Sequence, residues 1–366
     1  MLRLSVILMF IIYTFTSLKA QQNPVKYGIV GLTHSHVHWI LGNLKTEAYE
    51  VVGIVEPNKA LAERFAKQYK FPMELVYSSM DELFVQNQPQ AVLAFGTVYE
   101  HLEVVEKCAP KGIHVMVEKP LAVSLAHAKK MEQWAKKHNI HLLTNYETTW
   151  YPTMQKTYDL LQSNAIGEIR KVIIRDGHKG PARINLDPEF FDWLTDPVQN
   201  GGGAITDFGC YGANLMTWFM QGKKPISVTA VTQQLQKENN PKVDDDATIV
   251  LSYNNCNAVL QPSWNWTIGR KDVEVYGYDG VIYADNGHHL RIRMSKGYDG
   301  FKEEKMELKT FEKPYHNPFY YFAAIIKNEV KLQPYYLSSL ENNMVVMEIL
   351  DAAIRSARSG KTVKLE

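Results

Sequence analysis

The order of apolar and amphipathic segments predicts an α/β protein with a doubly wound parallel sheet, followed by an α+β domain with a mainly antiparallel sheet. Between residues 25 and 146, short apolar stretches alternate with longer amphipathic ones. After Pro152, apolar stretches follow one another with only short turns between them. Alternating strands and helices form parallel sheets, whereas consecutive strands joined by short turns pair antiparallel. A chain of 366 residues is long enough for two such cores.

In the first part, we expect strands where short apolar runs end at charged or turn residues. These strands are residues 25–31, 51–55, 91–95, 114–118 and 140–144. The helices between them are expected at residues 35–44, 59–69, 101–111 and 124–138, where charges surround an apolar stripe. Right-handed crossovers would place these helices on both faces of the sheet. We assign residues 24–147 to this domain.

In the second part, strand-like runs are separated by turns rich in Asn, Gly and Asp. The expected strands are residues 168–176, 226–234, 247–253, 258–264, 272–276 and 281–284. The expected helices are residues 153–163, 204–220, 318–330 and 338–359, and the last of them ends at Gly360. A turn of three glycines, Gly201-Gly202-Gly203, precedes the second of these helices. We assign residues 148–366 to an α+β domain for substrate binding and oligomerisation.

The bulk composition excludes several classes of function. Lys and Arg number 40 and Asp and Glu number 39, so the formal net charge is +1. This balance gives no electrostatic basis for binding nucleic acid or a polybasic attraction to a membrane. The three cysteines, Cys108, Cys210 and Cys256, lie far apart and form neither a disulfide framework nor a metal-ligand spacing. We expect them to be buried small apolar residues.

The first 20 residues have the order of a secretory signal. Arg3 precedes the apolar run 4–13, and small residues lead to Ala20, the expected cleavage point. A membrane anchor is the alternative, but the run is shorter than the roughly 20 residues that a span needs. We expect export through the general pathway to a bacterial periplasm, with no membrane span in the mature chain. Because that route threads an unfolded chain, any cofactor would be acquired after export.

An acidic residue follows the second expected strand, as in dinucleotide-binding units. Glu56 directly follows residues 51–55, and its distance along the chain from Gly31 is suitable for a ribose-binding acid. A carboxylate at this position accepts hydrogen bonds from ribose hydroxyls and repels a 2′-phosphate. The pattern therefore favours NAD over NADP. The alternative is a solvated glutamate at the end of a strand.

The loop after the first strand departs from the usual glycine pattern. Gly31 can serve as the first glycine, but Thr33 and His36 occupy the second and third glycine positions. A threonine side chain hinders close approach of the backbone to a diphosphate, and a histidine crowds the packing of helix on sheet. The hydroxyls of Thr33 and Ser35 can bind phosphate or cap the helix instead. Gly31, Thr33, His34 and Ser35 are the cofactor-binding candidates of this loop.

His34, His36 and His38 form an alternating triplet that would share one face of a strand and bind a metal there. Here the triplet straddles a loop and a helix start, which separates the side chains. No carboxylate or cysteine lies beside the triplet in the sequence. We therefore predict no metal site and interpret these residues as loop and capping histidines.

Three motifs in order resemble the glucose–fructose oxidoreductase / inositol dehydrogenase (Gfo/Idh/MocA) family, and the similarity covers nearly all of the mature chain. The first is Gly96-Thr97 with Glu100-His101-Leu102 after the strand at 91–95. The second is Glu118-Lys119-Pro120-Leu121-Ala122, and the third runs from Gly201 to Tyr211. The resemblance implies a Rossmann dinucleotide-binding domain, and cofactor contacts from Gly96, Thr97, His101, Glu118 and Lys119.

The resemblance also implies three catalytic residues, Lys119, Asp207 and Tyr211. Lys119 would lie near the nicotinamide and the reacting carbon, at the carboxyl end of a parallel strand. Asp207 and Tyr211 are four residues apart, which places them on one face of a helix. We expect Lys119 to lower the pKa of Tyr211, so that this tyrosine acts as the base in alcohol oxidation. Asp207 would orient Lys119 or a sugar hydroxyl.

Three further residues are substrate-binding candidates. Trp264 offers a face for stacking against a sugar ring, and His178 offers a hydrogen bond. Asn145 follows the last strand of the first part, where the family often lines its site. The arginine that the family often carries shortly afterwards is absent, and Thr148-Thr149-Trp150 stands there instead. The resemblance further implies a homo-oligomer, a dimer or a tetramer.

These observations predict a secreted NAD-linked oxidoreductase that acts on a sugar or a polysaccharide-derived saccharide. Because free NAD is scarce outside the cytoplasm, the cofactor should be tightly held and recycled by oxidising one sugar and reducing another. One alternative is an NAD-dependent glycosidase that cleaves by transient oxidation and elimination. Another is a cofactor-free sugar-binding accessory protein on the same fold.

Overall fold

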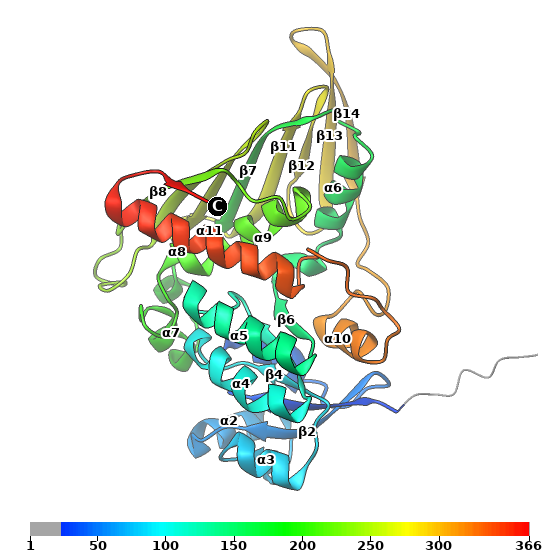
Figure 1. The fold of residues 1–366 in the computed structure, drawn as a ribbon, viewed down its shortest axis with the longest axis vertical. Helices are drawn as coiled ribbons and strands as arrows, with labels where there is room; N and C mark the ends of the chain where they lie inside the picture. Colours follow the sequence, from blue (N-terminus) through cyan, green and yellow to red (C-terminus); the bar gives the residue numbers. More distant parts are fainter. Residues whose placement is uncertain (1–22, 366) are drawn as a thin grey trace, which may run out of the picture.

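The computed structural model describes residues 23–365 and divides them between two sheets (Figure 1). The expected export signal at residues 1–20 lies outside the described residues. Among the described residues, no helix is long and apolar enough to cross a membrane.

The first sheet has six parallel strands in the order β3-β2-β1-β4-β5-β6. Its strands are β1 (Val25–Val30), β2 (Tyr49–Val55), β3 (Val76–Tyr77), β4 (Ala91–Ala94), β5 (His114–Glu118) and β6 (Leu142–Asn145). The chain winds outward in both directions from β1, so the carboxyl ends of β1 and β4 flank the switch point where such sheets bind ligands. The predicted doubly wound sheet is confirmed.

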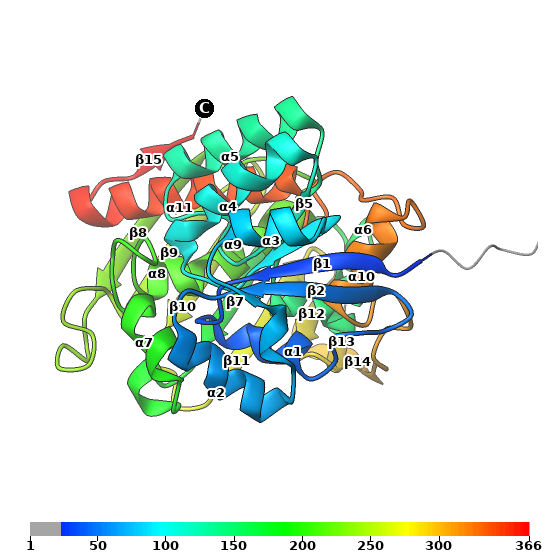
Figure 2. The ribbon, with the colours of Figure 1, turned by 90° about the horizontal axis from the view of Figure 1, so that it is seen from below.

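Helices cover both faces of this sheet, with α1 and α2 on one side and α3, α4 and α5 on the other (Figure 2). Their bounds are α1 (His38–Leu41), α2 (Lys59–Tyr69), α3 (Met80–Gln86), α4 (His101–Cys108) and α5 (Leu125–His138). Side-chain caps fix several starts: Asn58 accepts from the Leu61 N–H, and Ser124 accepts from the His127 N–H. The segment expected as one helix at 35–44 is instead the 3₁₀ turn Ser35–Val37 followed by α1.

The second sheet has nine strands in the order β14-β13-β12-β11-β7-β10-β9-β8-β15. Its strands are β7 (Ile169–Gly177), β8 (Ser227–Gln233), β9 (Asp246–Ser252), β10 (Asn257–Ser263), β11 (Arg270–Gly277), β12 (Gly280–Ala284), β13 (His289–Lys296), β14 (Gly300–Glu307) and β15 (Val363–Lys364). Among the strands of the described residues 23–365, only β7 and β10 of this sheet pair in parallel, so the sheet is mainly antiparallel, as predicted.

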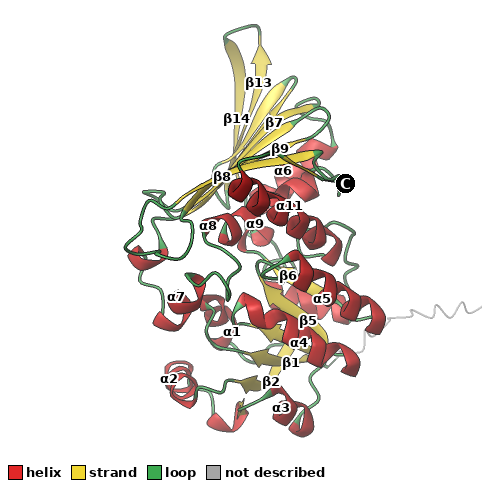
Figure 3. Ribbon diagram, turned by 60° about the vertical axis from the view of Figure 1, so that its left-hand side comes forward, coloured by secondary structure: helices red, strands yellow, loops and turns green. Residues whose placement is uncertain are grey.

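Helices lie between this sheet and the first domain (Figure 3). The helices after β6 are α6 (Pro152–Gln162), α7 (Pro188–Leu194), α8 (Ala204–Asp207), α9 (Gly209–Phe219), α10 (Pro318–Ile326) and α11 (Leu340–Ser359). The helix expected at 204–220 is interrupted: α8 ends at Asp207 and α9 begins at Gly209. Helix α11 ends at Gly360 in the left-handed conformation, φ +66°, as its sequence predicts.

The division of the chain at residue 147 needs one correction. Helix α10 belongs to the core of the first sheet, although it lies in the second part of the sequence. Phe319 and Phe322 are buried there with Tyr27 and Tyr49. The Tyr27 hydroxyl donates to the Phe319 carbonyl oxygen at 2.8 Å. The aromatic residues on α10 are therefore needed to cover β1 and β2.

Three strands of the second sheet, β13, β14 and β15, have no counterpart in the sequence prediction. In β14, all residues are at least partly exposed and charges dominate. A strand at the edge of a sheet does not bury a continuous apolar face, so it lacks the alternation that identifies inner strands.

Candidate active site

Two cavities lie at the carboxyl ends of the first sheet. The Glu56 cavity, of about 230 Å³, is lined by the ends of β1 and β2 and by neighbouring loops, including Gly31, Thr33, Glu56, Gly96 and Glu100. The Lys119 cavity, of about 170 Å³, is lined by both domains. Its wall consists of His34, Ser35, His36, Lys119, Glu147, His178, Ile184, Leu186, Phe190, Leu194, Asp207, Phe208, Tyr211 and Lys271.

The loop after β1 lies close against the loop after β4. Gly31 has φ +80°, and a Cβ atom there would come within 2.5 Å of the Gly96 backbone nitrogen. The His34 N–H donates to the Phe95 carbonyl oxygen at 2.8 Å. Glycine at position 31 is thus required both by its conformation and by the approach of the second loop.

Glu56 has the surroundings expected of a ribose-binding acid. Its carboxylate accepts from the Leu32 N–H at 3.0 Å and from the Asn58 N–H at 2.8 Å. A carboxylate has about four acceptor positions, so capacity remains for further donors. Burial raises the pKa of Glu56. Two more glutamates, Glu100 and Glu103, and one lysine, Lys107, line the same cavity. Because Lys107 is paired with Asp81 at 3.1 Å and with Glu103 at 3.5 Å, the unpaired charge in the cavity is acidic, which suits ribose hydroxyls and disfavours an additional phosphate.

Lys119 and Asp207 form a buried ion pair in the second cavity. They are 6% and 3% exposed, and the Lys119 ammonium group also donates to the Asp207 carbonyl oxygen at 3.3 Å. Burial alone would lower the pKa of Lys119, but the adjacent Asp207 carboxylate raises it above its ordinary value. Burial opposes ionisation of Asp207 as well, and Lys119 brings its pKa below the ordinary value. Both groups are therefore charged at neutral pH.

The triple-glycine turn places α8 against this pair. Gly201 has φ +82°, and a Cβ atom there would lie 2.5 Å from the Val123 carbonyl oxygen. A Cβ atom on Gly203 would lie 1.8 Å from the Asp244 carbonyl oxygen. Asp244 in turn accepts from the Gly203 and Ile205 N–H groups at 3.1 and 2.7 Å. Because Val123 closely follows Lys119, this packing brings Asp207 to the lysine.

Tyr211 lies in the same cavity, but two expectations about it were wrong. The break between α8 and α9 means that Asp207 and Tyr211 do not share one continuous helix. Tyr211 is 2% exposed, and its ring centre lies 5.4 Å from Lys119 Nζ. Burial raises the pKa of Tyr211 well above its ordinary value, and nearby Glu147 adds to the effect. At neutral pH the residue is therefore a protonated phenol.

Two histidines in the cavity wall have tautomers fixed by backbone hydrogen bonds. His34 Nδ1 accepts from the His36 N–H at 3.1 Å, and His178 Nδ1 accepts from the Gly180 N–H at 3.0 Å. Burial lowers the pKa of His34 well below its ordinary value and that of His178 to about 4. A neutral imidazole has one N–H and one lone pair. Each Nε2 therefore carries the hydrogen and is a donor.

The fold brings a carboxylate to two of the three loop histidines. Ligand atoms of His34, His36 and Glu118 lie within 4.8 Å of one another. His38 is separate and contacts Asp187 at 3.0 Å and Tyr69 at 2.6 Å. The lone pair of His34 is already used on Nδ1, so metal coordination through Nε2 would require an imidazolate. This arrangement does not suit a metal ion.

Several predicted residues lie behind the cavity walls. Trp264 is fully buried, and its indole N–H donates to Asp207 Oδ2 at 2.9 Å, which corrects the expectation of a stacking face. Asn145 donates to Glu118 Oε1 at 2.8 Å and accepts from the Trp150 indole at 3.0 Å, so both ends of its amide are occupied. Asn145 therefore positions Glu118 and is not part of the lining.

Three residues predicted to bind the cofactor have local roles. The Thr97 hydroxyl accepts from the Glu100 N–H at 3.3 Å, and Glu100 accepts from the Thr97 N–H at 2.7 Å, a capping box. His101 Nδ1, at the start of α4, lies 3.1 Å from the Leu121 carbonyl oxygen in the loop after β5. Glu118 Oε2 lies 2.9 Å from His36 Nδ1. The structure shows none of these three in either cavity wall.

Two charged residues of the Lys119 cavity were not predicted from the sequence. Lys271 on β11 donates to Glu147 at 2.8 Å, and Lys271 Nζ lies 5.6 Å from the centre of the Tyr211 ring. Glu147 follows β6 closely and could have been found as a neighbour of Asn145. Lys271 has no such signal, because only the pairing of β11 with β7 brings it to the site.

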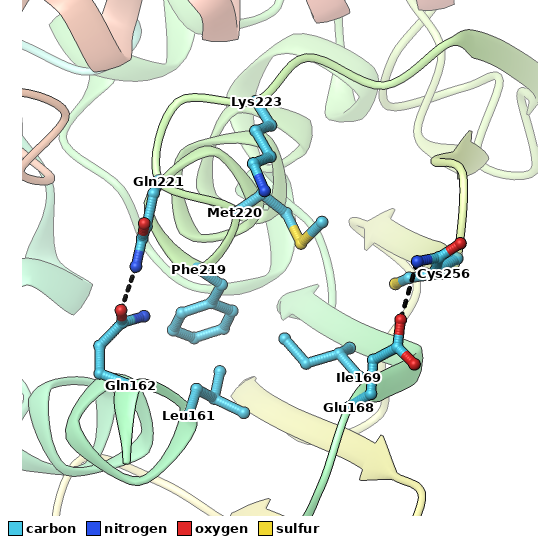
Figure 4. A pocket seen from close by; sticks show the side chains of 10 residues that line it. Leu161, Gln162, Glu168, Ile169, Phe219, Met220, Gln221, Lys223 and Cys256 are labelled. Atoms are coloured by element: carbon cyan, nitrogen blue, oxygen red, sulfur yellow. Dashed lines mark hydrogen bonds between the residues drawn. The ribbon is translucent and has the colours of Figure 1, made fainter. Parts of the chain in front are cut away.

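A further cavity of about 300 Å³ lies away from this chemistry, between the ends of α6 and α9 and the start of β7 (Figure 4). Phe219 and Leu161 contribute apolar surface, and Asn255 donates to Glu168 at 2.8 Å across one side. Its lining contains neither the Lys119–Asp207 pair nor a residue of the loop after β1. We therefore place the active site at the other two cavities.

The fold and the paired cavities define an α/β protein whose first sheet is of the dinucleotide-binding type. The sequence profile described as an oxidoreductase family with an NAD-binding Rossmann fold matches residues 25–146. The profile of the GFO/IDH/MocA C-terminal domain matches residues 154–283. Together these matches cover more than half of the chain, which therefore belongs to the Gfo/Idh/MocA family.

Among curated proteins, a similar one is the trans-1,2-dihydrobenzene-1,2-diol dehydrogenase of Xenopus tropicalis. It is 26% identical over 246 residues, which are 66% of this chain and 69% of the relative. Two solved structures share the fold. The aldose–aldose oxidoreductase of Caulobacter crescentus, in complex with glycerol, has a TM-score of 0.77 at 20% identity. The alignment covers 93% of this chain and 100% of the oxidoreductase chain. An inositol dehydrogenase homologue from Azotobacter vinelandii, in complex with NAD⁺, has a TM-score of 0.80 at 17% identity. The alignment covers 94% of this chain and 98% of the homologue.

Proposed function

We propose that this protein is an exported enzyme that uses NAD to interconvert a hydroxyl and a carbonyl group on a sugar or a polysaccharide-derived saccharide. The observation that carries the proposal is the Lys119–Asp207 pair beside Tyr211, in a cavity formed by both domains. The Glu56 cavity lies at the same edge of the sheet and suits a ribose. The names of the similar proteins refer to a diol, an aldose and inositol, all polyhydroxy compounds.

The protonation states of the site suit proton donation to a carbonyl oxygen. NAD, when bound, accepts or supplies the hydride. In the reducing direction, the Tyr211 phenol gives its proton to the substrate oxygen, and the Lys119 ammonium stabilises the negative charge developing there. Asp207 keeps Lys119 charged. In the oxidising direction, Tyr211 can accept the proton of the substrate hydroxyl only after its phenol has lost its own proton.

The two histidines do not supply an alternative base. Each presents Nε2–H, because its Nδ1 accepts from a backbone N–H. His178 instead suits a donor role toward a substrate hydroxyl or carbonyl oxygen, and it stays our substrate-binding candidate. Lys271 on β11 and Glu147 form a second pair of polar groups in the cavity, and this pair can bind sugar hydroxyls.

The proposal includes export and assembly, which rest on sequence alone. Residues 1–20 have the pattern of a cleaved signal, and a periplasmic enzyme would hold its NAD tightly and recycle it between two sugars. We also propose a homo-oligomer, dimer or tetramer, which light scattering of the purified mature chain would reveal.

Nucleotide content tests the cofactor part of the proposal. The chain lacking the residues before Gln21 would be purified and denatured, and the released NAD(H) and NADP(H) measured. We expect stoichiometric NAD, or micromolar NAD binding to the apoprotein by calorimetry, abolished by Glu56→Arg. The same charge change at the exposed Glu74 is the control and should leave binding intact. No nucleotide and no binding would overturn the proposal.

The pH dependence tests the assigned protonation states. Because the pKa of both Tyr211 and Lys119 is raised, proton donation should persist up to high pH, so kcat/KM for carbonyl reduction stays flat between pH 6 and 9. For oxidation, kcat/KM should still be rising at pH 9, because the phenol must first lose its proton. A plateau in the oxidation profile below pH 7 would instead indicate a base with an ordinary or lowered pKa and contradict this assignment.

A further inference from the structure

The loop after β1 contains two buried polar atoms without a partner among the described residues, Thr33 Oγ1 and His34 Nε2. Both belong to the segment in which Thr33 replaces a glycine of the usual pattern. Buried donors almost always have a partner, because an unpaired one loses its hydrogen bonds to water without compensation. Among the described residues whose buried side-chain atoms lack a partner, only Thr33 and His34 line the two cavities of the site, where a ligand can supply the acceptors.

The positions of the two residues show where this ligand would lie. Thr33 lines the Glu56 cavity, whereas His34 lines the Lys119 cavity. A molecule that occupies both cavities must therefore pass this loop between them. In a dinucleotide, the group between the two ends is the diphosphate, which offers only acceptor oxygens.

The chemical character of both atoms matches such acceptors. His34 Nε2 carries a hydrogen, because Nδ1 accepts from the His36 N–H, and the ring is held by Phe190 at 4.7 Å between centroids. The Thr33 hydroxyl rotates freely and can donate. Lys119, the nearby cation, is already paired with Asp207, so the loop offers neutral donors to the ligand.

We propose that Thr33 and His34 form a diphosphate-binding surface made of side-chain donors, which replaces the backbone amides exposed by a glycine-rich loop. This inference rests on the proposed use of NAD and specifies which residues of this chain recognise it. It explains why a loop with a threonine at a glycine position is compatible with a dinucleotide.

Calorimetric titration with NAD and with ADP tests the proposal, since both carry the diphosphate and only NAD carries the nicotinamide. Thr33→Val keeps the shape of the side chain and removes the hydroxyl, and His34→Phe keeps a ring without the N–H. We expect each variant to bind both nucleotides about tenfold more weakly, as for a lost hydrogen bond to a charged group. His34→Gln retains an N–H donor and should recover part of the loss.

A matched control is Thr144→Val, which removes another buried, unpartnered hydroxyl from a residue that lines neither cavity. Its affinities should stay within twofold of the wild type, and thermal unfolding without ligand should show that all variants are folded. If wild-type protein binds NAD and both loop variants bind it equally well, the diphosphate assignment fails and the proposed function stands. Variants that bind NAD more weakly but bind ADP as well as the wild type does would also overturn the diphosphate assignment. Absence of NAD binding to the wild type would instead overturn the proposed function.

Discussion

At the scale of single residues, the chemistry of the site depends on which buried groups have compensating partners. Lys119 is charged because Asp207 lies beside it, and Asp207 is charged because Lys119 and the Trp264 indole both contact it. Tyr211 lacks such compensation, so its phenol keeps its proton. The same desolvation thus has opposite outcomes for residues in one cavity.

The first prediction concerns Trp264 as a positioning residue. Trp264→Phe keeps an aromatic ring but removes the hydrogen bond to Asp207, so the pKa of Asp207 should rise and the ion pair should weaken. We expect kcat to fall about tenfold with KM within about twofold, together with an altered pH profile of kcat. Steady-state kinetics between pH 5 and 10 would measure this.

Trp218→Phe is the matched control, because Trp218 is also buried but stacks on Tyr158 at 4.2 Å in the core of the second domain. It should reduce stability without moving the pH profile. If Trp264→Phe also leaves that profile unmoved, Trp264 has only a packing role.

At the scale of elements, the active site depends on how closely the chain segments approach one another. The turn Gly201-Gly202-Gly203 packs against Val123 and Asp244 at distances that leave no room for a side chain. Helix α8 therefore begins beside the segment that follows Lys119. The glycines act here through close packing as well as through backbone conformation.

The second prediction tests this packing. In Gly203→Ala, the added methyl group would lie 1.8 Å from the Asp244 carbonyl oxygen, so α8 must shift. We expect a loss of about 3 kcal/mol in the free energy of unfolding and a larger fall in kcat than in NAD affinity, because α8 carries Asp207. Denaturant unfolding, kinetics and calorimetry on one preparation would measure all three.

Gly42→Ala provides the comparison, since φ is −71° and nothing lies within 4 Å of the added atom. This variant should be as stable as the wild type or slightly more stable. Equal effects of the two substitutions would argue against a packing role for the triple-glycine turn.

At the scale of the whole molecule, helices from the C-terminal part connect the two sheets. Helix α10 completes the core of the first sheet, and α11 contacts both α9 of the second domain and α5 of the first. Figure 1 shows α11 running between the two parts of the molecule. We therefore expect the two domains to unfold together.

The third prediction follows from this arrangement. Phe322 is fully buried and stacks on Tyr27 at 5.9 Å, so Phe322→Ala should cost about 3–5 kcal/mol of stability through the cavity it leaves. Calorimetry should show one transition shifted to lower temperature, since the first sheet cannot melt alone. Phe301→Ala, at a side chain 53% exposed, should leave the transition unchanged. Two transitions, of which only one shifts, would show that the domains are independent.

Much of the fold follows from local sequence patterns. Strands such as β5 and helices such as α2 were predicted to the residue, because an apolar run or a capped amphipathic stripe is visible within one segment. Glu56, Lys119 and Asp207, which line the two cavities, could be singled out from the sequence, since each follows a strand or lies in a motif with a characteristic spacing. Strand β13 and the edge strand β14 were not predicted, because their stability comes from pairing with neighbours.

The sequence by itself determined the two-sheet architecture, the family and the residue types that reach the active site. Only the tertiary structure decided what several of these residues do there. Trp264 supports Asp207 across 57 positions of the chain, and Lys271 meets Glu147 across 124. The protonation of Tyr211 and the tautomer of His34 likewise depend on burial and on single backbone contacts. Such properties arise from the electrostatic environment in the folded molecule, and no local pattern of residues encodes that environment.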